Sequence, residues 1–568
     1  MKTMWMVVGC LSLFSGPVLA AVYHVAGSEP AASDDGPGSA DKPWKTLTRA
    51  AGADLKPGDT VLVGTGVYRE EVRLTRSGEP GQPITFAAAP GAHVVIKGSD
   101  VITGEWKRLK GDPARPEPYP NAYANVWQVK LDDRFFPPNE RRYISSVFLD
   151  EQPLQEIGPD AIYSNSDYDK LTIVGRDLRD IFAHSFFFDA PTQTLYVCVD
   201  GEPGWFLMEV GTRQWLMTVE KAHDVVVRGF EMRANRQPGG QWPAVSVGNC
   251  QRVVVEDCTV EQSDFCGLSL GSSQDCVVLH CTLSQNGDTG FSMGQCTDCR
   301  ISDCSLMHNN TRRFSGGWHC GGMKNIPNNV RCTVQRCEVA YTVDGPGIWF
   351  DSGNTDCRIL DNVVHDNDSC GIFYEINKGG GLIAGNLVYA NGGRGIYISG
   401  SQKVWIVHNT VAGNNCGIVM MPREGDWTLE DCHVLDNLLL DNYLAGPTGP
   451  RGCDLTIYMG PNVDSNRTVL SNHSDYNLYA AGPGIPTLRQ HWNPNNSLEQ
   501  WVQRFSEDTH SRAQPMLWQL RGDRFDLTDP DAAAKTRFAT PVPDSLNWKP
   551  AEPACVGCGW GISRSPVR

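Results

Sequence analysis

The sequence has few of the features that would place a chain in a membrane or on a nucleic acid. Beyond its N-terminal segment, no stretch holds about 18 consecutive apolar residues, so no transmembrane helix is expected in the mature protein. No run of Lys and Arg offsets the formal net charge of −16 at pH 7. This charge disfavours nucleic acid and anionic lipid as partners. A polyanionic substrate is disfavoured for the same reason, unless a bound cation screens it.

Patterns that mark several common enzyme classes are also missing. We recognise no catalytic Ser/His arrangement, no Gly-rich phosphate loop and no cluster with metal-ligand spacing. No cofactor is therefore expected to be required. Calcium is left open, because exposed acidic residues can hold it.

The N-terminus predicts export. Lys2 gives a charged start, Met4–Phe14 is mostly apolar, and the small residues up to Ala20 suit signal-peptide cleavage after that residue. We therefore expect a secreted or periplasmic protein. Cys10 follows a lipoprotein-like box, but the apolar run before it is too short, so lipid attachment there is not expected.

Cysteine is abundant, with 20 residues, and it recurs at regular intervals. Short segments rich in Val, Ile and Leu repeat, each with Cys or Asn at the same place. The steps between these places are 23, 23, 33, 25, 24, 23 and 28 residues. They hold Cys258, Cys281, Cys304, Cys337, Asn362, Asn386, Asn409 and Asn437. A second column, five residues earlier, holds Cys276, Cys299, Cys332, Cys357 and Cys432.

A period near 23 residues, with β-branched runs between turns, predicts a solenoid. We expect an all-β chain that forms a right-handed parallel β-helix, with equivalent residues of neighbouring coils ~4.8 Å apart. The column cysteines should be small buried thiols, with disulfides between coils as the competing interpretation. The Asn amides should hydrogen-bond along their column. The separate pair Cys555 and Cys558 favours a local disulfide over a metal site, which would need two more ligands.

The places where the period begins, breaks off and weakens divide the chain into parts. An open coil end exposes unpaired strand edges, so a cap is expected before the first coils. Short helices are expected near Trp44–Ala51 and Ser497–Phe505. The parts are a signal peptide (1–20), an N-terminal cap with the first coils (21–139), an inserted antiparallel β subdomain (140–215), the main parallel β-helix (216–445), and C-terminal coils with a tail packed on the helix (446–568).

Another strand of each coil begins with Gly. The apolar residue after the Gly must point inward, and side chains alternate between faces along a strand, so the third and fifth residues point outward. One outward column is predicted to hold Trp349, Phe373 and Tyr397. The column beside it would hold Asp351, Glu375 and Ser399.

Asp351 and Glu375 are 24 residues, or one coil, apart. Two carboxylates on neighbouring strands repel, so we expect one to keep a proton near neutral pH. A retaining glycosidase needs two carboxyl groups about 5–5.5 Å apart, whereas an inverting enzyme needs a wider gap. The spacing therefore favours a retaining mechanism. The other interpretations are solvated surface charge and a calcium site.

The one enlarged coil, the 33-residue step, precedes the carboxylate coils. Binding groups concentrate on such loops. We therefore expect Trp318, His319 and Lys324 to contact a substrate, although His319 could equally be structural and Lys324 a plain surface residue.

Residues 318–411 carry a sharper resemblance. Gly347-Ile348-Trp349-Phe350-Asp351 and, one coil later, Phe373-Tyr374-Glu375-Ile376-Asn377 resemble glycoside hydrolase family 120, β-xylosidases that share the fold of pectate lyases. The resemblance implies Asp351 as nucleophile, Glu375 as acid/base and Asn377 as a further substrate contact. The segment Trp318–Lys324 is also similar to family 141, whose members act on fucosides and xylan. This sequence departs from the xylosidases at Lys378-Gly379-Gly380, which leaves the sugar and its linkage open.

The predicted function is therefore that of a secreted glycosidase acting on a plant or microbial polysaccharide or oligosaccharide. A polysaccharide lyase or uronate epimerase on the same fold is one alternative, because Lys324 could serve as its base. A non-catalytic glycan-binding or envelope protein is the other. The sequence leaves open the sugar, the choice of exo or endo action, and the oligomeric state.

Overall fold

The computed structural model describes most of the chain between residues 20 and 527, with gaps. The described residues are 20–109, 125–136, 142–157, 175, 177–237, 241–314, 316, 319–423, 425–442, 444–446, 449–451, 453–457, 469–480, 488–489, 496–514, 518–521, 524–527 and 548. The signal peptide, Cys10, Trp318, Cys555 and Cys558 lie outside them, so the predictions for those positions stay predictions.

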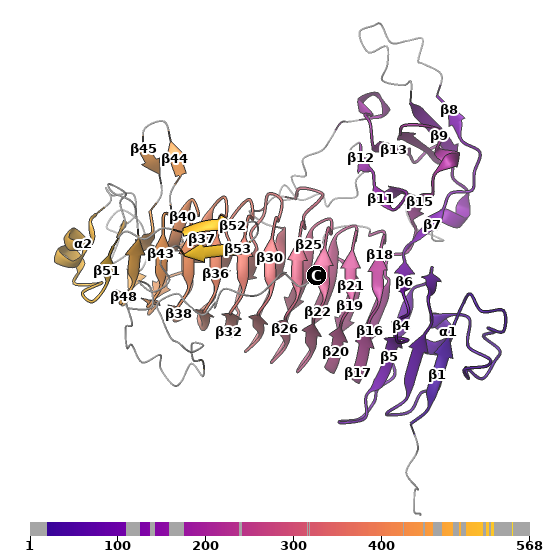
Figure 1. Cartoon of the computed structure of the whole chain (residues 1–568), viewed down its shortest axis with the longest axis horizontal. Coiled ribbons are helices and arrows are strands. Elements are labelled where there is room, and N and C mark those ends of the chain that lie inside the picture. The colour runs from indigo at the N-terminus through magenta and orange to yellow at the C-terminus, as the bar shows by residue number, and fades with distance from the viewer. Residues whose placement is uncertain are drawn as a thin grey trace, which may run out of the picture.

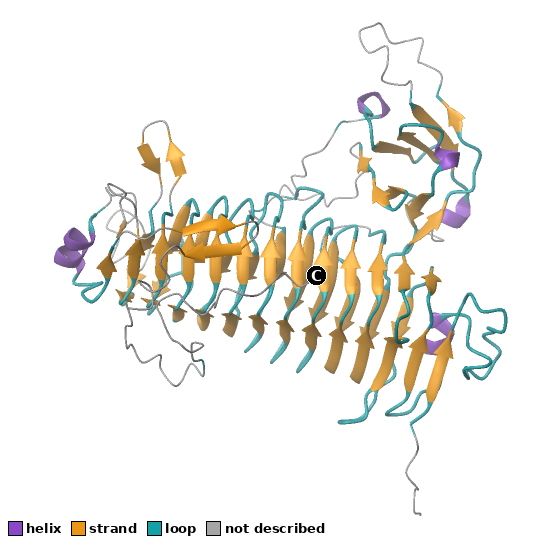
Figure 2. Ribbon diagram, viewed as in Figure 1, coloured by secondary structure: helices purple, strands orange, loops and turns teal. Residues whose placement is uncertain are grey.

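The described chain is a parallel β-helix, as the period predicts. Coil after coil stacks along the long axis of the molecule (Figure 1). Strands dominate, and the two α-helices lie near the opposite ends (Figure 2). Each complete coil supplies one strand to each of three long sheets, here called A, B and C. None of the described helices is both long and apolar enough to cross a membrane.

The three sheets have 13, 12 and 13 strands. Sheet A consists of β1 (Val22–Val25), β2 (Thr60–Val63), β5 (Ile84–Ala88), β17 (His223–Arg228), β20 (Gln251–Glu256), β23 (Val277–Leu279), β26 (Arg300–Ser302), β29 (Thr333–Gln335), β32 (Thr355–Leu360), β35 (Gly379–Ala384), β38 (Val404–Val407), β42 (His433–Leu435) and β48 (His473–Asp475). Sheet B consists of β4 (Val72–Leu74), β16 (Met217–Glu220), β19 (Pro243–Gly248), β22 (Cys266–Gly271), β25 (Thr289–Gly294), β28 (Gly321–Asn325), β31 (Ile348–Asp351), β34 (Ile372–Glu375), β37 (Arg394–Ser399), β40 (Cys416–Met421), β46 (Leu455–Ile457) and β50 (Leu488–Arg489). Sheet C consists of β3 (Gly66–Tyr68), β6 (Val94–Lys97), β18 (Glu231–Arg233), β21 (Thr259–Glu261), β24 (Thr282–Ser284), β27 (Ser305–Met307), β30 (Glu338–Ala340), β33 (Val363–His365), β36 (Leu387–Tyr389), β39 (Thr410–Ala412), β43 (Leu438–Leu440), β49 (Leu478–Ala480) and β51 (Arg512–Ala513).

The interior is filled by the columns that the sequence predicts. The described cysteines are free thiols, and all but Cys416 are buried, so no disulfide joins the described coils. The Asn column forms a hydrogen-bonded ladder, in which the Nδ2 of Asn362 donates to the Oδ1 of Asn386 at 2.9 Å and Asn386 donates to Asn409 at 2.9 Å. The ladder continues to Asn437 at 3.0 Å. Both predictions are confirmed.

Cys and Asn can occupy the same column because each accepts a hydrogen bond from the same backbone N–H. The N–H of Cys281 donates to the Sγ of Cys304 at 3.3 Å. Further along, the N–H of Asn362 donates to the Oδ1 of Asn386 at 2.9 Å. Each side chain thus accepts the N–H of the preceding coil at a turn, where strand pairing does not supply an acceptor.

An insertion with its own core interrupts the first coils and rises from one end of the helix (Figure 1). Its strands are β7 (Ser99–Val101), β8 (Lys107–Arg108), β9 (Val126–Lys130), β10 (Val147–Leu149), β11 (Gln152–Pro153), β12 (Gln155–Glu156), β13 (Ser185–Asp189), β14 (Thr194–Cys198) and β15 (Met208–Gly211). All their pairings are antiparallel except β12 with β13. The antiparallel strands therefore begin at Ser99, well before residue 140. Early strands such as β9 pair with β14, far along the chain, and leave no local periodic signal.

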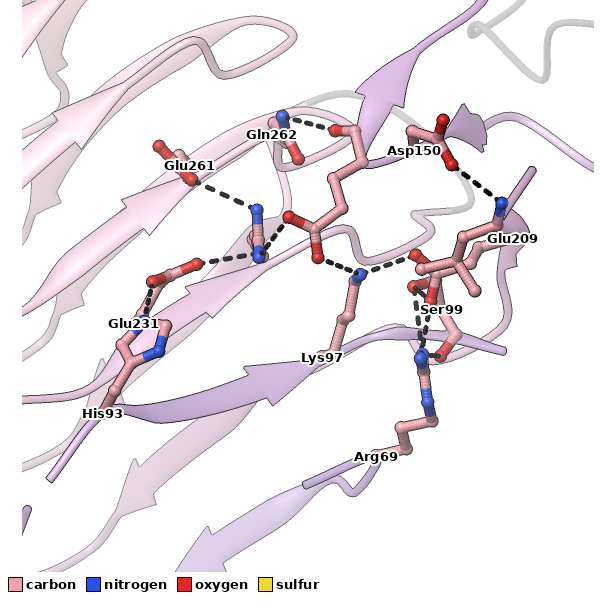
Figure 3. A network of polar contacts seen from close by, with 12 residues as sticks. Arg69, His93, Lys97, Ser99, Asp150, Glu209, Glu231, Glu261 and Gln262 are labelled. Carbon is pink, nitrogen blue, oxygen red and sulfur yellow. Dashed lines mark hydrogen bonds and ion pairs between the residues drawn. The ribbon is translucent and has the colours of Figure 1, made fainter. Parts of the chain in front are cut away.

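Ion pairs around the buried Lys97 and Glu209 tie the insertion to sheet C (Figure 3). The Nζ of Lys97, in β6, lies 2.5 Å from the Oε2 of Glu209, in β15, and 3.2 Å from the Oε1 of Glu151. Arg69 contacts the other oxygen of Glu209 at 2.6 Å, and Arg233 contacts Glu151 at 3.0 Å. Glu209 is fully buried. Buried charges of this kind need such partners, so the network fixes where the insertion stands on the coils.

Both ends of the solenoid carry a short helix. Helix α1 (Leu47–Ala51) begins after the N-cap Thr46 and covers only the second part of the expected stretch. Helix α2 (Leu498–Phe505) forms where the sequence predicts a helix, and it begins after Ser497 with a capping box to Gln500. The hairpin of β52 (Trp518–Arg521) and β53 (Arg524–Leu527) packs Trp518 and Leu527 against a patch of sheet C.

Candidate active site

The outward face of sheet B carries the predicted columns in register. Trp349 pairs with Phe373, and Phe373 with Tyr397, on adjacent strands β31, β34 and β37. Phe350 lies between the outward residues of β31 and belongs to the interior core, which fixes the alternation. Lys324, on β28, pairs with Trp349 and extends the column by one coil.

The two acidic residues are direct neighbours. Asp351 pairs with Glu375, and Glu375 with Ser399, at the carboxyl ends of the same strands. Paired strands lie ~4.8 Å apart, so both carboxylates emerge on one face at nearly the same height. Each is only 6% exposed. They are therefore covered groups, which distinguishes them from the solvated surface charges considered above.

Each carboxylate has a cationic partner. The Nζ of Lys324 lies 3.4 Å from the Oδ2 of Asp351, and the Oγ of Ser352 donates to its Oδ1 at 2.8 Å. The guanidinium of Arg423 contacts the Oε1 of Glu375. Burial lowers the pKa of Lys324 below its usual value, while the attraction of Asp351 opposes that shift.

The aromatic rings form a continuous stack beside the carboxylates. Trp349 and Phe373 have centroids 5.0 Å apart, and Phe373 and Tyr397 4.8 Å apart, with interplanar angles of 22° and 13°. The Nζ of Lys324 sits over the Trp349 ring at 3.7 Å. Trp349 is 1% exposed, and its indole N–H has no partner among the described residues. A buried donor without an acceptor is costly.

The enlarged coil contributes His319. Its Nδ1 lies 2.9 Å from the Oδ2 of Asp288, which is fully buried just before β25. The backbone oxygen of His319 accepts a hydrogen bond of 3.1 Å from Gln241. This pairing supports the structural interpretation of His319, because a buried carboxylate holds its ring. Asp288 was not singled out in the sequence, since it stands outside every repeated column.

Asn377 does not face the site, and its expected role as a substrate contact is wrong. Its side chain is fully buried at a turn, where its Oδ1 accepts from the Nδ2 of Asn354 at 3.0 Å. Its Nδ2 donates to the backbone oxygen of Phe350 at 3.1 Å. Asn377 thus belongs to a second amide ladder inside the coil.

Arg423 is the main site residue that the sequence did not indicate. It lies between β40 and β41 (Leu429–Glu430), in a loop of which residues 422, 423 and 425–428 are described, and reaches back across two strands to Glu375. The loop is closed by a 3.0 Å bond from the N–H of Arg423 to the backbone oxygen of Trp427. It rests on Gly400, where a Cβ would come within 2.9 Å of the Trp427 Cβ.

The described residues contain no group of three or more His, Cys, Asp or Glu side chains arranged to hold a metal ion. What the described site offers is a pair of carboxylates with one cation each. A stack of rings lies beside them.

Comparisons with known proteins agree on the fold. The family model described as "Right handed beta helix region" matches residues 243–386 and 374–499. The solved structure described as "The complex structure of XylC with xylose" has a TM-score of 0.64 at 16% identity, covering 89% of each chain. The all-β, right-handed parallel β-helix predicted from the sequence is thus confirmed, and this likeness shows the fold alone.

Two further matches are weaker. A solved structure described as "Glycoside hydrolase" has a TM-score of 0.49 at 11% identity, covering 83% of this chain and 95% of that one. Among curated proteins, the uncharacterized protein YwoF of Bacillus subtilis (strain 168) is 36% identical over 78 residues. That match spans 14% of this chain and 16% of the relative.

Proposed function

We propose that this protein is a glycoside hydrolase in which Asp351 is the nucleophile and Glu375 the general acid/base. The observation that carries the proposal is the register of β31 and β34, which pairs the two carboxylates on the outward face of sheet B. Neighbouring strands are ~4.8 Å apart, close to the ~5–5.5 Å that separates the carboxyl groups of retaining glycosidases. The reaction proposed is therefore a retaining one.

In this mechanism Asp351 attacks the anomeric carbon while Glu375 donates a proton to the departing glycosidic oxygen. The C–O bond to the leaving sugar breaks and a covalent glycosyl–Asp351 ester forms. Glu375, now a carboxylate, takes a proton from water, which attacks the ester and releases the sugar with its original configuration. Lys324, 3.4 Å from Asp351, holds the nucleophile in place through this ion pair.

The neighbouring rings support a sugar substrate. Phe373 and Tyr397, which are partly exposed, offer flat apolar surface beside the carboxylates, and the buried Trp349 supports the stack. The XylC likeness agrees with this proposal at the level of fold. Export remains part of the proposal.

The test is hydrolysis of a glycan panel by the wild-type protein and by Glu375→Gln, which keeps size and polarity but cannot exchange a proton. We expect reducing sugar from at least one glycan, and a loss of about 10²–10⁴-fold in the variant, the usual contribution of general acid–base catalysis. Proton NMR should show retained configuration at the anomeric carbon. Equal rates for both proteins would rule out Glu375, and an inverted product would rule out the covalent step.

A second candidate function rests on Lys324. Its pKa is lowered by burial, which suits an amine to act as a base, as a lyase on uronate polysaccharides would require. β-Elimination would remove the proton next to the carboxylate, break the C–O bond at the neighbouring carbon and leave an unsaturated product that absorbs in the ultraviolet. The same glycan panel read by absorbance separates the two. Reducing sugar released without absorbance supports the hydrolase.

A further inference from the structure

The C-terminal side of the candidate site is rich in positive charge. Arg423 contacts Glu375, Arg394 stacks on Tyr397 with its Cζ 4.1 Å from the ring centroid, and the Nζ of Lys378 lies 4.8 Å from the centroid of Trp427. Together with Lys324, which lies 3.4 Å from Asp351, these cations lie on or next to strands of sheet B, in a chain whose formal net charge is −16.

Two of these cations have no acidic partner. Arg394 and Lys378 contact aromatic rings and form no ion pair with any described residue. Asp426, on the same loop as Arg423, forms none with them either. Two cations near a covered site, without counter-charges, are poised to bind an anionic group.

The pairing of Arg423 with Glu375 is itself informative. An acid/base residue must face the leaving oxygen of the substrate, whereas the Glu375 carboxylate contacts the Arg423 guanidinium. Arg423 is 46% exposed on its loop, so it can turn to another partner. A second carboxylate, presented by the substrate, would bind Arg423 through two parallel hydrogen bonds and leave Glu375 free to take up a proton.

We propose that Arg423 and Trp427 form a subsite for a sugar carboxylate, so that the substrate is a glycan containing uronic acid. Where the reacting bond lies relative to this subsite rests on the proposed function. The binding of the sugar carboxylate does not. Trp427, 36% exposed on the same loop, would stack on the ring of that sugar while Arg423 and Lys378 contact its carboxylate. Gly400 allows Trp427 to take this position, because a side chain at residue 400 would collide with it.

The experiment measures binding in the Asp351→Asn background, which blocks turnover and leaves the loop intact. Isothermal titration calorimetry with sodium glucuronate and sodium galacturonate is compared with glucose and galactose, their neutral counterparts. We expect at least one uronate to bind about tenfold more tightly than its neutral counterpart, which corresponds to ~1.4 kcal/mol. Adding Arg423→Gln should remove that preference and leave the affinity for the neutral sugar unchanged.

Arg331→Gln is the matched control, because Arg331 is also a half-exposed arginine that pairs with a carboxylate, Asp298 at 2.6 Å, but belongs to the sheet A side. It should keep the preference. Equal affinities for acid and neutral sugars, a preference that survives Arg423→Gln, or tight binding of glucose 6-sulfate without uronate binding would each overturn the proposal. The two proposals can be told apart. Uronate binding without hydrolysis of any glycan would support the subsite and contradict the proposed hydrolase activity.

Discussion

Replacing Asn386 by Ala should reveal how much the interior amide ladder contributes to stability. Asn386 is fully buried. Its Oδ1 accepts from both the backbone N–H and the Nδ2 of Asn362, each at 2.9 Å. Its Nδ2 donates at 2.9 Å to the Oδ1 of Asn409 and to the backbone oxygen of Ile359. Its Nδ2 also donates to the backbone oxygen of Ala384 at 3.2 Å, and Ala removes all five bonds.

The size of the effect follows from what is left behind. The N–H of Asn362 loses its acceptor and stays buried, which costs ~1–3 kcal/mol. The weakened pairing of the remaining amides and carbonyls adds about 1 kcal/mol. We therefore expect Asn386→Ala to lower the free energy of unfolding by about 2–4 kcal/mol.

The chain supplies its own matched control. In the same column the N–H of Cys281 donates to the Sγ of Cys304 at 3.3 Å, so a thiol can replace the amide as acceptor. Asn386→Cys should accordingly keep an acceptor for Asn362 and lose about half as much stability as Asn386→Ala. The measurement is equilibrium urea unfolding of the three reduced proteins, followed by far-ultraviolet circular dichroism. Equal losses for Ala and Cys would refute the role given to the column acceptor.

Two further predictions concern a buried acid and the aromatic stack. Burial raises the pKa of Asp454 from 3.8 to about 7. The folded protein then holds this proton more tightly than the unfolded chain, so stability is lost as pH rises from about 3.8 to about 7. Asp454→Asn should extend the amide ladder that reaches it from Asn442, and should be more stable than wild type above that range in a thermal melt. Parallel pH curves for the two proteins would show that Asp454 is not the source. Phe373→Ala removes two ring contacts worth ~0.5–1.5 kcal/mol each. It should raise KM for the best substrate more than it lowers kcat. The KM of Phe373→Leu should lie between those of the wild type and Phe373→Ala. A fall in kcat at unchanged KM would contradict a purely positioning role.

The parts of the fold that sequence could predict are those that repeat. Stacked coils place the same positions in contact, so a Cys or Asn column in the sequence becomes a buried column in space. The same logic placed Asp351 beside Glu375 and aligned Trp349, Phe373 and Tyr397, because all of them occupy fixed positions after a Gly. Those predictions were right because the strands of sheet B pair in register.

The rest depends on contacts that break the repeat. Arg423 reaches Glu375 from a loop two coils later, and nothing in the spacing of either residue indicates that contact. Asp288 and His319 meet across the enlarged coil, where the period fails. Asn377 was misplaced for a related reason, since a residue two positions after Glu375 has already left the strand. At the turn, its amide is needed to satisfy the neighbouring coil.

The charge of the chain shows how a global property can mislead about a site. A net charge of −16 argues against an anionic substrate as long as the charge is spread evenly. It is not: Lys324 and Arg423 contact Asp351 and Glu375, while Arg394 and Lys378 contact the rings of Tyr397 and Trp427. Interactions between exposed charges fade beyond ~8 Å at physiological salt, so a ligand at this site would experience these four cations more strongly than the distant acidic surface. An acidic protein can thus keep an attractive site for an acidic sugar, while its remaining surface repels the same polymer elsewhere.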